Sequence, residues 1–309
     1  MLNVEMNVEV NVEIKMKRNM LSAMAASLSF VCIFLMSSIS LADPVWKVTH
    51  EQNTVYVAGT IHTLTPEDYP LPASFETAYN NADILVFETD LAEMNTPEGQ
   101  ALLMQSILYA DGKNLQNVLS PAVYQELAQF LQSRGGDINR VAQFKPGMLS
   151  VLLTLEELKR LNQLGQGVDD FFDQRAQADK KTRLFLETIE QQLGFLANMG
   201  EGQEDRFILY SIRELESLSS VMAQLKAAWR QGDNLTLEKI GINEWREDFP
   251  VIYQNLLVRR NNAWIPQIEA MLNTNPTEAV LVGALHLVGN EGVLQQLRDR
   301  GYKVEQLQQ

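Results

Sequence analysis

The chain has 309 residues, a net charge of −14 at neutral pH and a single cysteine, Cys32. Its acidity, with no run of Lys or Arg after Arg18, argues against a nucleic-acid partner, because binding to phosphates needs clustered cations. One cysteine excludes disulfides within the chain and zinc sites built from several thiolates.

The first 42 residues predict a targeting segment. A low-complexity Asn-Val-Glu repeat covers residues 1–14, three basic residues follow, and residues 21–36 are mainly apolar. Ser40-Leu41-Ala42 is a small-x-small cleavage sequence before Asp43. This order predicts a secretory signal peptide cleaved near Ala42-Asp43, and a periplasmic or secreted protein. The alternative is an uncleaved membrane anchor. No later apolar stretch is long enough to span a bilayer, so we expect no stable membrane span after cleavage.

Short apolar runs predict the strands Val55–Ala58, Ile84–Phe87, Arg183–Leu186 and Val280–Val282, with a fifth at Tyr302–Gln306. Periodic apolar patterns predict helices at Ala73–Ala82, after Ser120-Pro121, at Gly147–Leu164, Val168–Ala178, Thr188–Met199, Asp205–Gln231 and Asn261–Asn273, and before Gly301. Strands alternating with helices at this spacing favour an α/β fold with a mostly parallel sheet. No linker divides residues 43–309, so we expect one domain with a helical insertion at about residues 97–178 and 188–275.

The two ends of this domain repeat one local pattern. An apolar run followed by Gly-x-x-His ends at His62 near the start, and the same pattern ends at His286 near the end. A helix and a strand follow each copy, so the core is predicted to contain two β-Gly-x-x-His-α-β units. Only three histidines occur in the chain, and the third, His50, has a polar neighbourhood typical of a surface residue. The pair therefore suggests one site built from both ends of the domain.

Carboxylates follow two other predicted strands. Glu88 comes directly after Ile84–Phe87, and Glu187 directly after Arg183–Leu186. Ligands of open parallel sheets bind beyond the carboxyl ends of the strands, so we expect these glutamates near the two imidazoles. Such a set suits Mn, Co, Fe or Zn. The alternative for each glutamate is a first-turn acid of a following helix.

Arg259 and Arg260 lie in a polar turn at the start of a predicted helix, with Asn261 and Trp264 after them. An arginine here would suit a substrate carboxylate or an oxyanion. The alternative is a solvated basic turn with Trp264 in the core, and the pattern alone favours this alternative. Gly-x-Ser-x-Gly, phosphate-loop, dinucleotide and His-Glu-x-x-His motifs are absent, which argues against the commonest serine hydrolases, NTPases, dehydrogenases and zinc peptidases.

Several short motifs, taken in order, resemble the TraB/GumN family, whose wider group includes the Tiki metalloproteases and is related to ChaN and erythromycin esterase. The motifs are Gly59-Thr60-Ile61-His62, Phe87-Glu88, Gly167-Val168-Asp169, Leu186-Glu187-Thr188, Arg260-Asn261-x-x-Trp264 and Gly283-Ala284-Leu285-His286. The resemblance implies site roles for His62, Glu88, Arg260 and His286, followed by Asp169, Glu187 and Asn261. It departs at Leu285, where the family often has a small residue, and this bulk is expected to narrow the site.

Tiki members are peptidases that depend on Mn or Co, so the resemblance implies an exported metal-dependent hydrolase acting on a peptide or protein. In this hypothesis His62, Glu88 and His286 bind a divalent metal, with Mn or Co favoured over Zn or Fe. Glu187 is a candidate general base or further ligand. Arg260, with Asn261 beside it, would stabilise an oxyanion or bind a substrate carboxylate.

Two other functions remain open from the sequence. One is a metal-independent hydrolase in which a histidine acts as general base, as the erythromycin-esterase relatives suggest. The other is a periplasmic protein that binds or inhibits a peptide without turnover.

Overall fold

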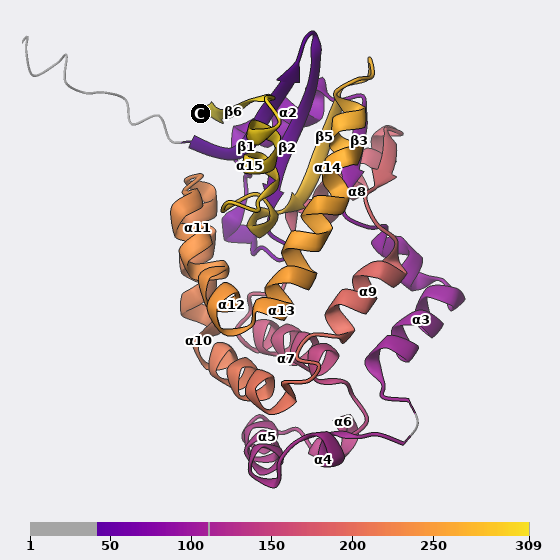
Figure 1. Ribbon diagram of the computed structural model, residues 1–309, viewed down its shortest axis with the longest axis vertical. Coiled ribbons are helices and arrows are strands. Elements are labelled where there is room, and N and C mark those ends of the chain that lie inside the picture. The colour runs from indigo at the N-terminus through magenta and orange to yellow at the C-terminus, as the bar shows by residue number, and fades with distance from the viewer. Residues whose placement is uncertain (1–41, 111, 309) are drawn as a thin grey trace, which may run out of the picture. The chain divides into compact units, whose positions relative to one another are not determined.

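The computed structural model describes residues 42–110 and 112–308 (Figure 1). Apart from Ala42, the predicted signal peptide lies outside the described residues. None of the helices among these residues is long and apolar enough to cross a membrane.

A six-stranded sheet with the strand order β4-β3-β5-β2-β1-β6 forms the centre of the described part. Its strands are β1 (Ala42–His50), β2 (Asn53–Thr60), β3 (Ile84–Phe87), β4 (Thr182–Phe185), β5 (Glu278–Gly283) and β6 (Lys303–Gln308). Strands β2, β5, β3 and β4 are parallel, whereas β1 is antiparallel to both β2 and β6. The predicted α/β fold with a mostly parallel sheet is therefore confirmed.

Strand β1 was not predicted. It forms a hairpin with β2, in which Val48 pairs with Val55. The connecting turn contains Glu51 at a φ of 51°, a conformation usually supplied by Gly or Asn. Without such a residue the turn leaves no signal in the sequence.

The helices fall close to the predicted ranges but divide the middle of the chain more finely. They are α2 (Ala73–Asn81), α3 (Pro97–Ile107), α4 (Leu115–Val118), α5 (Pro121–Ser133), α6 (Ile138–Val141), α7 (Pro146–Arg160), α8 (Val168–Asp179), α9 (Ile189–Ala197), α10 (Glu204–Arg230), α11 (Asn234–Gly241), α12 (Asn243–Asp248), α13 (Pro250–Tyr253), α14 (Arg259–Met271) and α15 (Val293–Asp299). A π-helical turn, η3 (Gln254–Val258), joins α13 to α14, and short 3-10 turns occur at η1 (Pro66–Asp68), η2 (Leu91–Asn95) and η4 (Ala284–His286).

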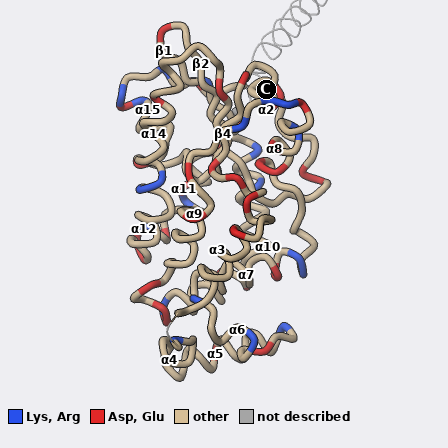
Figure 2. The backbone as a smooth tube through the Cα atoms, turned by 90° about the vertical axis from the view of Figure 1, so that its right-hand side faces the viewer, with Lys and Arg blue, Asp and Glu red and all other residues tan. Residues whose placement is uncertain are grey.

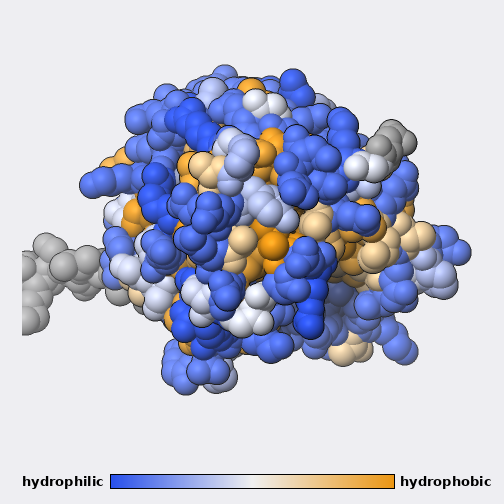
Figure 3. All heavy atoms as spheres, turned by 90° about the horizontal axis from the view of Figure 1, so that it is seen from below, coloured by the Kyte–Doolittle hydropathy of each residue, from blue (hydrophilic) through white to orange (hydrophobic). Residues whose placement is uncertain are grey.

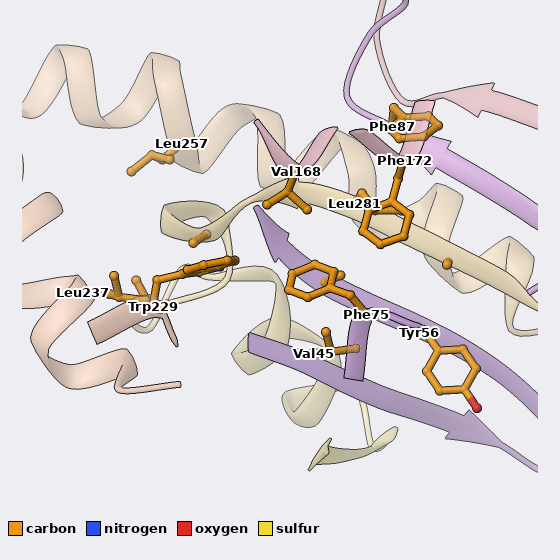
Figure 4. Packing of buried hydrophobic residues seen from close by; sticks show 14 of the residues in the cluster. Val45, Tyr56, Phe75, Phe87, Val168, Phe172, Trp229, Leu237, Leu257 and Leu281 are labelled. Atoms are coloured by element: carbon orange, nitrogen blue, oxygen red, sulfur yellow. The ribbon is translucent and has the colours of Figure 1, made fainter. Parts of the chain in front are cut away.

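Helices cover both faces of the sheet. Alternate residues of β2, such as Val55 and Val57, pack with residues of α14 and α15 on one face. Tyr56 and Ala58 point to the other face and pack in a cluster with residues of α2, α8 and the end of α10. Figure 4 shows part of this second cluster around Trp229. Successive side chains of β2 point to opposite faces of the sheet, and both faces are buried. This explains why most of the β2 sequence is apolar.

The other helices lie beyond one end of the sheet (Figure 1). Residues of α4, α5, α7 and α10 form a separate apolar cluster there. The face seen from below in Figure 3 is mostly hydrophilic, with hydrophobic residues grouped near its middle.

Candidate functional site

The carboxyl ends of the parallel strands bring distant residues together. Thr60 at the end of β2 is in register with Gly283 at the end of β5. Glu88 follows β3 on the other side of β5, and its Oε1 accepts a hydrogen bond of 2.7 Å from the N–H of Gly283. The N–H of Glu187 donates to the carbonyl of Glu88 at 2.9 Å, which continues the pairing of β3 with β4. The two glutamates are therefore neighbours because of the sheet topology.

Arg260 lies at the centre of a buried ion cluster and is 8 % exposed. Its Nη2 donates to Glu88 Oε2 at 2.5 Å and to Glu187 Oε1 at 2.6 Å, and its Nε donates to Glu187 Oε2 at 3.1 Å. Burial opposes its charge, but Glu88 and then Glu187 keep its pKa above the ordinary value. The alternative of a solvated basic turn therefore fits the exposed Arg259 and not Arg260.

The π-helical turn η3 positions this arginine. Only Arg259 separates it from Arg260 and Asn261, and its Leu256 carbonyl accepts a hydrogen bond of 3.2 Å from Arg260 Nη1. Such turns are rare and occur often at functional sites, because they change the direction of the side chains that follow. The sequence of η3, Gln-Asn-Leu-Leu-Val, carries no signal for a π-helical turn, so this feature was not predicted.

His286 is buried and neutral. Asn261 donates through Nδ2 to the carbonyls of His286 and Glu291, so its Oδ1 accepts from His286 Nδ1 at 2.6 Å. The lone pair of His286 is then on Nε2, which lies 3.0 Å from Arg260 Nη1. Burial outweighs the attraction of Glu88 and lowers the pKa of His286 to about 3. Asn261 therefore fixes the tautomer that leaves Nε2 able to accept a proton or a cation.

His62 is held in the same way but is open to solvent. Its side chain is 67 % exposed, and its Nδ1 lies 2.8 Å from Asp169 Oδ2. Thr60 donates to the other oxygen of Asp169 at 2.7 Å, which orients the carboxylate. The charge of Asp169 raises the pKa of His62 to about 9, so the imidazole is protonated at neutral pH. The pair of histidines thus consists of one charged, exposed ring and one neutral, buried ring.

The two glutamates also differ in charge. Burial opposes the ionisation of Glu88, but the charges of Arg260 and of the protonated His62, together with the hydrogen bond from the N–H of Gly283, hold its pKa well below the ordinary value. Burial raises the pKa of Glu187 above its ordinary value in spite of the hydrogen bonds from Arg260. Glu88 is thus an anion throughout the physiological range, and Glu187 is the carboxylate that takes up a proton more readily.

Three of the candidate metal ligands surround Gly283. A Cβ at this residue would lie 3.3 Å from Glu88 Oε1, 3.5 Å from His62 Nε2 and 3.6 Å from His286 Cδ2. Gly283 has a φ of −50°, which any residue can adopt, and a side chain here would occupy the space between these three groups. Each imidazole has its Nδ1 held by an oxygen, which is the arrangement found around metal-binding histidines.

The guanidinium of Arg260 takes up donor atoms that a metal would use. It hydrogen-bonds to His286 Nε2 and to Glu88 Oε2, so these two atoms are already occupied. His62 Nε2 and Glu88 Oε1 face the space at Gly283. Within the described ranges, no three His, Cys, Asp or Glu side chains are arranged to hold a metal ion as they stand. The residue types fit a divalent cation, and ligation by His286 would require Arg260 Nη1 to withdraw.

Two cavities meet at this site, and both are lined by His62, Arg260, Leu196 and Leu256. The first has a volume of about 290 Å³ and is bordered by three aspartates of α8 (Asp169, Asp170 and Asp173), where Figure 2 shows a group of acidic residues. The second has a volume of about 350 Å³ and is lined mainly by apolar side chains. An extended chain bound across His62 would therefore meet a cavity bordered by carboxylates on one side and a more apolar cavity on the other.

The structure adds residues that sequence analysis did not single out. Thr60 orients Asp169, and Gln192 Nε2 lies 3.4 Å from Glu88 Oε2. Thr60 belongs to a quoted motif and Gln192 lies in α9, shortly after another, but neither a Thr at a strand end nor a Gln within a helix has a pattern that predicts a contact. His50, which was expected at the surface, is partly buried and packs edge-on against Tyr302. It lies outside the cluster.

Comparison with known proteins places the chain in a family. A model described as the TraB/PrgY/gumN family matches residues 44–306. YbaP of Escherichia coli is 24 % identical over 247 residues, which are 79 % of this chain and 87 % of that protein. Metalloprotease TIKI2 of Danio rerio is 25 % identical over 81 % of this chain and 58 % of its own length. Metalloprotease TIKI1 of Danio rerio is 22 % identical over 84 % of this chain and 62 % of its own length. No solved structure matches significantly.

Proposed function

We propose that this chain, which belongs to the TraB/PrgY/gumN family, is an exported hydrolase that cleaves peptides with the help of a divalent cation. The observation that carries the proposal is the convergence of His62, Glu88 and His286 around Gly283, between two cavities. Two of the similar proteins are named metalloproteases, which supports hydrolysis at low identity. The export component rests on the signal-peptide pattern of residues 1–42.

In this proposal His62, Glu88 and His286 hold the cation, with Mn or Co favoured and Zn or Fe as alternatives. The cation would supply a positive charge that polarises a carbonyl group and lowers the pKa of a water molecule. Asn261 would keep His286 in the tautomer that presents Nε2 to the site. Asp169 would orient His62 so that its Nε2 faces the site, and a bound cation would have to displace the proton that this nitrogen carries at neutral pH.

Glu187 and Arg260 would transfer protons and stabilise charge. Glu187, whose pKa burial raises, would take a proton from the attacking water and pass it to the leaving amine as the C–N bond breaks. Arg260 would stabilise the negative charge that develops on the substrate oxygen, because its guanidinium is fixed by two carboxylates before the substrate binds.

Metal-supplemented cleavage tests the proposal directly. The purified chain is stripped with a chelator, reloaded with Mn, Co, Zn or Fe, and assayed for metal content and for cleavage of a peptide mixture by mass spectrometry. We expect bound metal and cleavage in the wild type, and at least about a hundredfold loss of both in the double variant His62→Ala/His286→Ala. His50→Ala is the matched control, since His50 lies away from the cluster. Equal and negligible metal in wild type and double variant would refute the metal component.

A metal-independent hydrolase is the second candidate, and the hydrogen bond between His62 and Asp169 favours it. An exposed imidazole held by a carboxylate is the usual arrangement of a catalytic acid or base. The raised pKa of His62 makes it a proton donor at neutral pH, which suits leaving-group protonation better than activation of water. Cleavage that persists in the chelated protein and is lost in Asp169→Asn would favour this candidate.

A further inference from the structure

We propose that the apolar cavity beside His62 selects a large apolar side chain of the substrate, within two residues of the bond that is cut. The inference rests on the proposed peptide hydrolysis and adds a substrate class to it. Three features support it: the lining of the cavity, its continuity with the candidate site, and the fixed positions of its walls.

Most of the lining is apolar and comes from several helices and turns. Helix α10, helices α11 and α12, the turn η3 and the turn after β5 contribute the side chains Met222, Leu225, Leu237, Trp245, Leu257 and Leu285. A volume of about 350 Å³ lies within the range of about 300–1,000 Å³ that is usual for ligand sites. Because apolar surface gains free energy when it leaves water, this cavity favours an aromatic or a long aliphatic side chain over a charged one.

The polar part of the same cavity consists of residues from the candidate site. Thr60, His62, Arg260, Gly283 and His286 line it together with the apolar side chains. A substrate side chain in this cavity therefore places its own backbone beside His62 Nε2 and the Arg260 guanidinium. This continuity identifies the occupant as a residue close to the reacting bond, rather than a distant anchor of the substrate.

The walls are held in place by contacts outside the cavity. Trp245 Nε1 donates to the hydroxyl of Tyr210 at 2.7 Å, so the indole presents its apolar ring without an unpaired N–H. Leu285 packs against Gly241, where a Cβ would lie 2.5 Å from Leu285 Cδ2. Since Gly241 provides the space for Leu285, the bulk of Leu285 is accommodated by α11 and sets one wall of the cavity.

The cavity on the other side of His62 has a different character. Its aspartates and Gln192 border it along with Phe87, Leu91 and Phe195. A substrate residue on that side therefore meets carboxylates as well as apolar surface, and the preference for a large apolar residue is expected to be weaker there. This asymmetry gives the test an internal control.

Cleavage profiling and peptide binding test the inference together. The purified chain, loaded with Mn or Co, digests a peptide mixture, and the products are aligned on the cleaved bond by mass spectrometry. Dansyl-labelled octapeptides that differ at one residue (Phe, Leu, Gly or Asp) are then compared in cleavage and, with chelated protein, in binding measured by fluorescence anisotropy. We expect about 10- to 100-fold higher kcat/KM, and tighter binding, for Phe or Leu than for Gly or Asp.

Two matched variants connect the preference to this cavity. Met222→Asp puts a charge on the partly buried wall of the apolar cavity and should reduce the ratio of Phe to Asp cleavage and binding at least about tenfold. Leu91→Asp makes the same change in the other cavity, where Leu91 is 51 % exposed, and should leave the ratio unchanged. Circular dichroism of both variants verifies that they fold.

The outcomes separate the two proposals. Cleavage without any apolar preference, or a preference that Met222→Asp leaves intact, overturns the inference and keeps the hydrolase. Selective binding of the Phe peptide that Met222→Asp abolishes, without cleavage under any metal condition, keeps the apolar selectivity of the cavity and overturns both the hydrolase and the placement of the selected residue beside a cleaved bond. Neither binding nor cleavage of any peptide overturns both.

Discussion

The hydrogen bond between His62 and Asp169 gives the candidate site a testable dependence on pH. Asp169 raises the pKa of His62 from 6.5 to about 9, so the folded state favours the protonated ring. The resulting stabilisation is fully present below about pH 6.5 and is lost as the pH rises through 9. Because the His62 side chain is 67 % exposed, solvent screens the pair and the effect on stability is small.

We expect Asp169→Asn in metal-free protein to lower the pKa of His62 towards its ordinary value, because the neighbouring negative charge is lost. Titration of the imidazole signals by NMR measures this shift, and three histidines in the chain make the assignment simple. Asp170→Asn is the matched control, since Asp170 is exposed and hydrogen-bonds to Gln174. An unchanged His62 titration in Asp169→Asn would show that Asp169 does not hold the ring in solution.

Single residues were predictable where a strand end marked them. His62, Glu88 and His286 follow buried strands, and a polar group that follows such a strand in a parallel sheet lies at the edge where ligands bind. Glu187 follows β4, a partly exposed edge strand. The site role of Arg260 was predictable only from the family resemblance. Its burial depends on carboxylates that are 73 and 172 residues away in sequence. A local pattern cannot reveal a partner at that separation.

Helix α8 makes a close contact with the loop of His62 at its N-cap residue. Gly167 is the N-cap of α8, and a Cβ there would lie 2.3 Å from the backbone oxygen of His62. The next residue, Val168, donates its N–H to the carbonyl of Ile61 at 3.0 Å. The start of α8 thus lies directly against the loop that carries His62, which places Asp169 within reach of the imidazole.

Gly167→Ala is expected to destabilise the fold by about 1–3 kcal/mol, because the added methyl group must displace a backbone. It should also separate Asp169 from His62. Gly194→Ala in α9 is the matched control: nothing lies within 4 Å of the added Cβ, and a gain of about 0.4–1 kcal/mol is expected for alanine in a helix. Urea denaturation measures both changes. A Gly167→Ala variant as stable as the wild type would contradict the close contact.

Elements were predictable from periodicity, and the exceptions have physical causes. The parallel strands β2, β3 and β5 are buried on both faces and have apolar sequences, whereas β4 is a partly exposed edge strand. Strand β1 was missed because its turn uses Glu51 in place of glycine. The π-helical turn η3 was missed because an extra residue in a helical turn leaves the composition unchanged. That turn matters most for function, since it precedes Arg260 and Asn261.

At the scale of the whole molecule, α10 connects the sheet to the helical insertion. Near its end, Trp229 is fully buried in the sheet-side cluster and its Nε1 donates to the carbonyl of Gly59 at 2.7 Å (Figure 4). Near its start, Ile208 and Ile212 belong to the cluster formed with α4, α5 and α7. One rigid helix of 27 residues therefore contributes to both cores, so neither core can lose its packing without disturbing the other.

We accordingly expect the described part of the chain to unfold in one cooperative transition, as the sequence-based prediction of a single domain also implies. Far-UV circular dichroism, dominated by the helices, and tryptophan fluorescence should give the same midpoint in urea. Trp229→Phe should lower the free energy of unfolding by about 1–3 kcal/mol in both signals alike, because the Gly59 carbonyl is left buried without its donor. Leu209→Ala on the exposed side of α10 serves as control, with a change within about 0.5 kcal/mol. Two separate transitions, of which Trp229→Phe shifts one, would identify the helical insertion as a domain of its own.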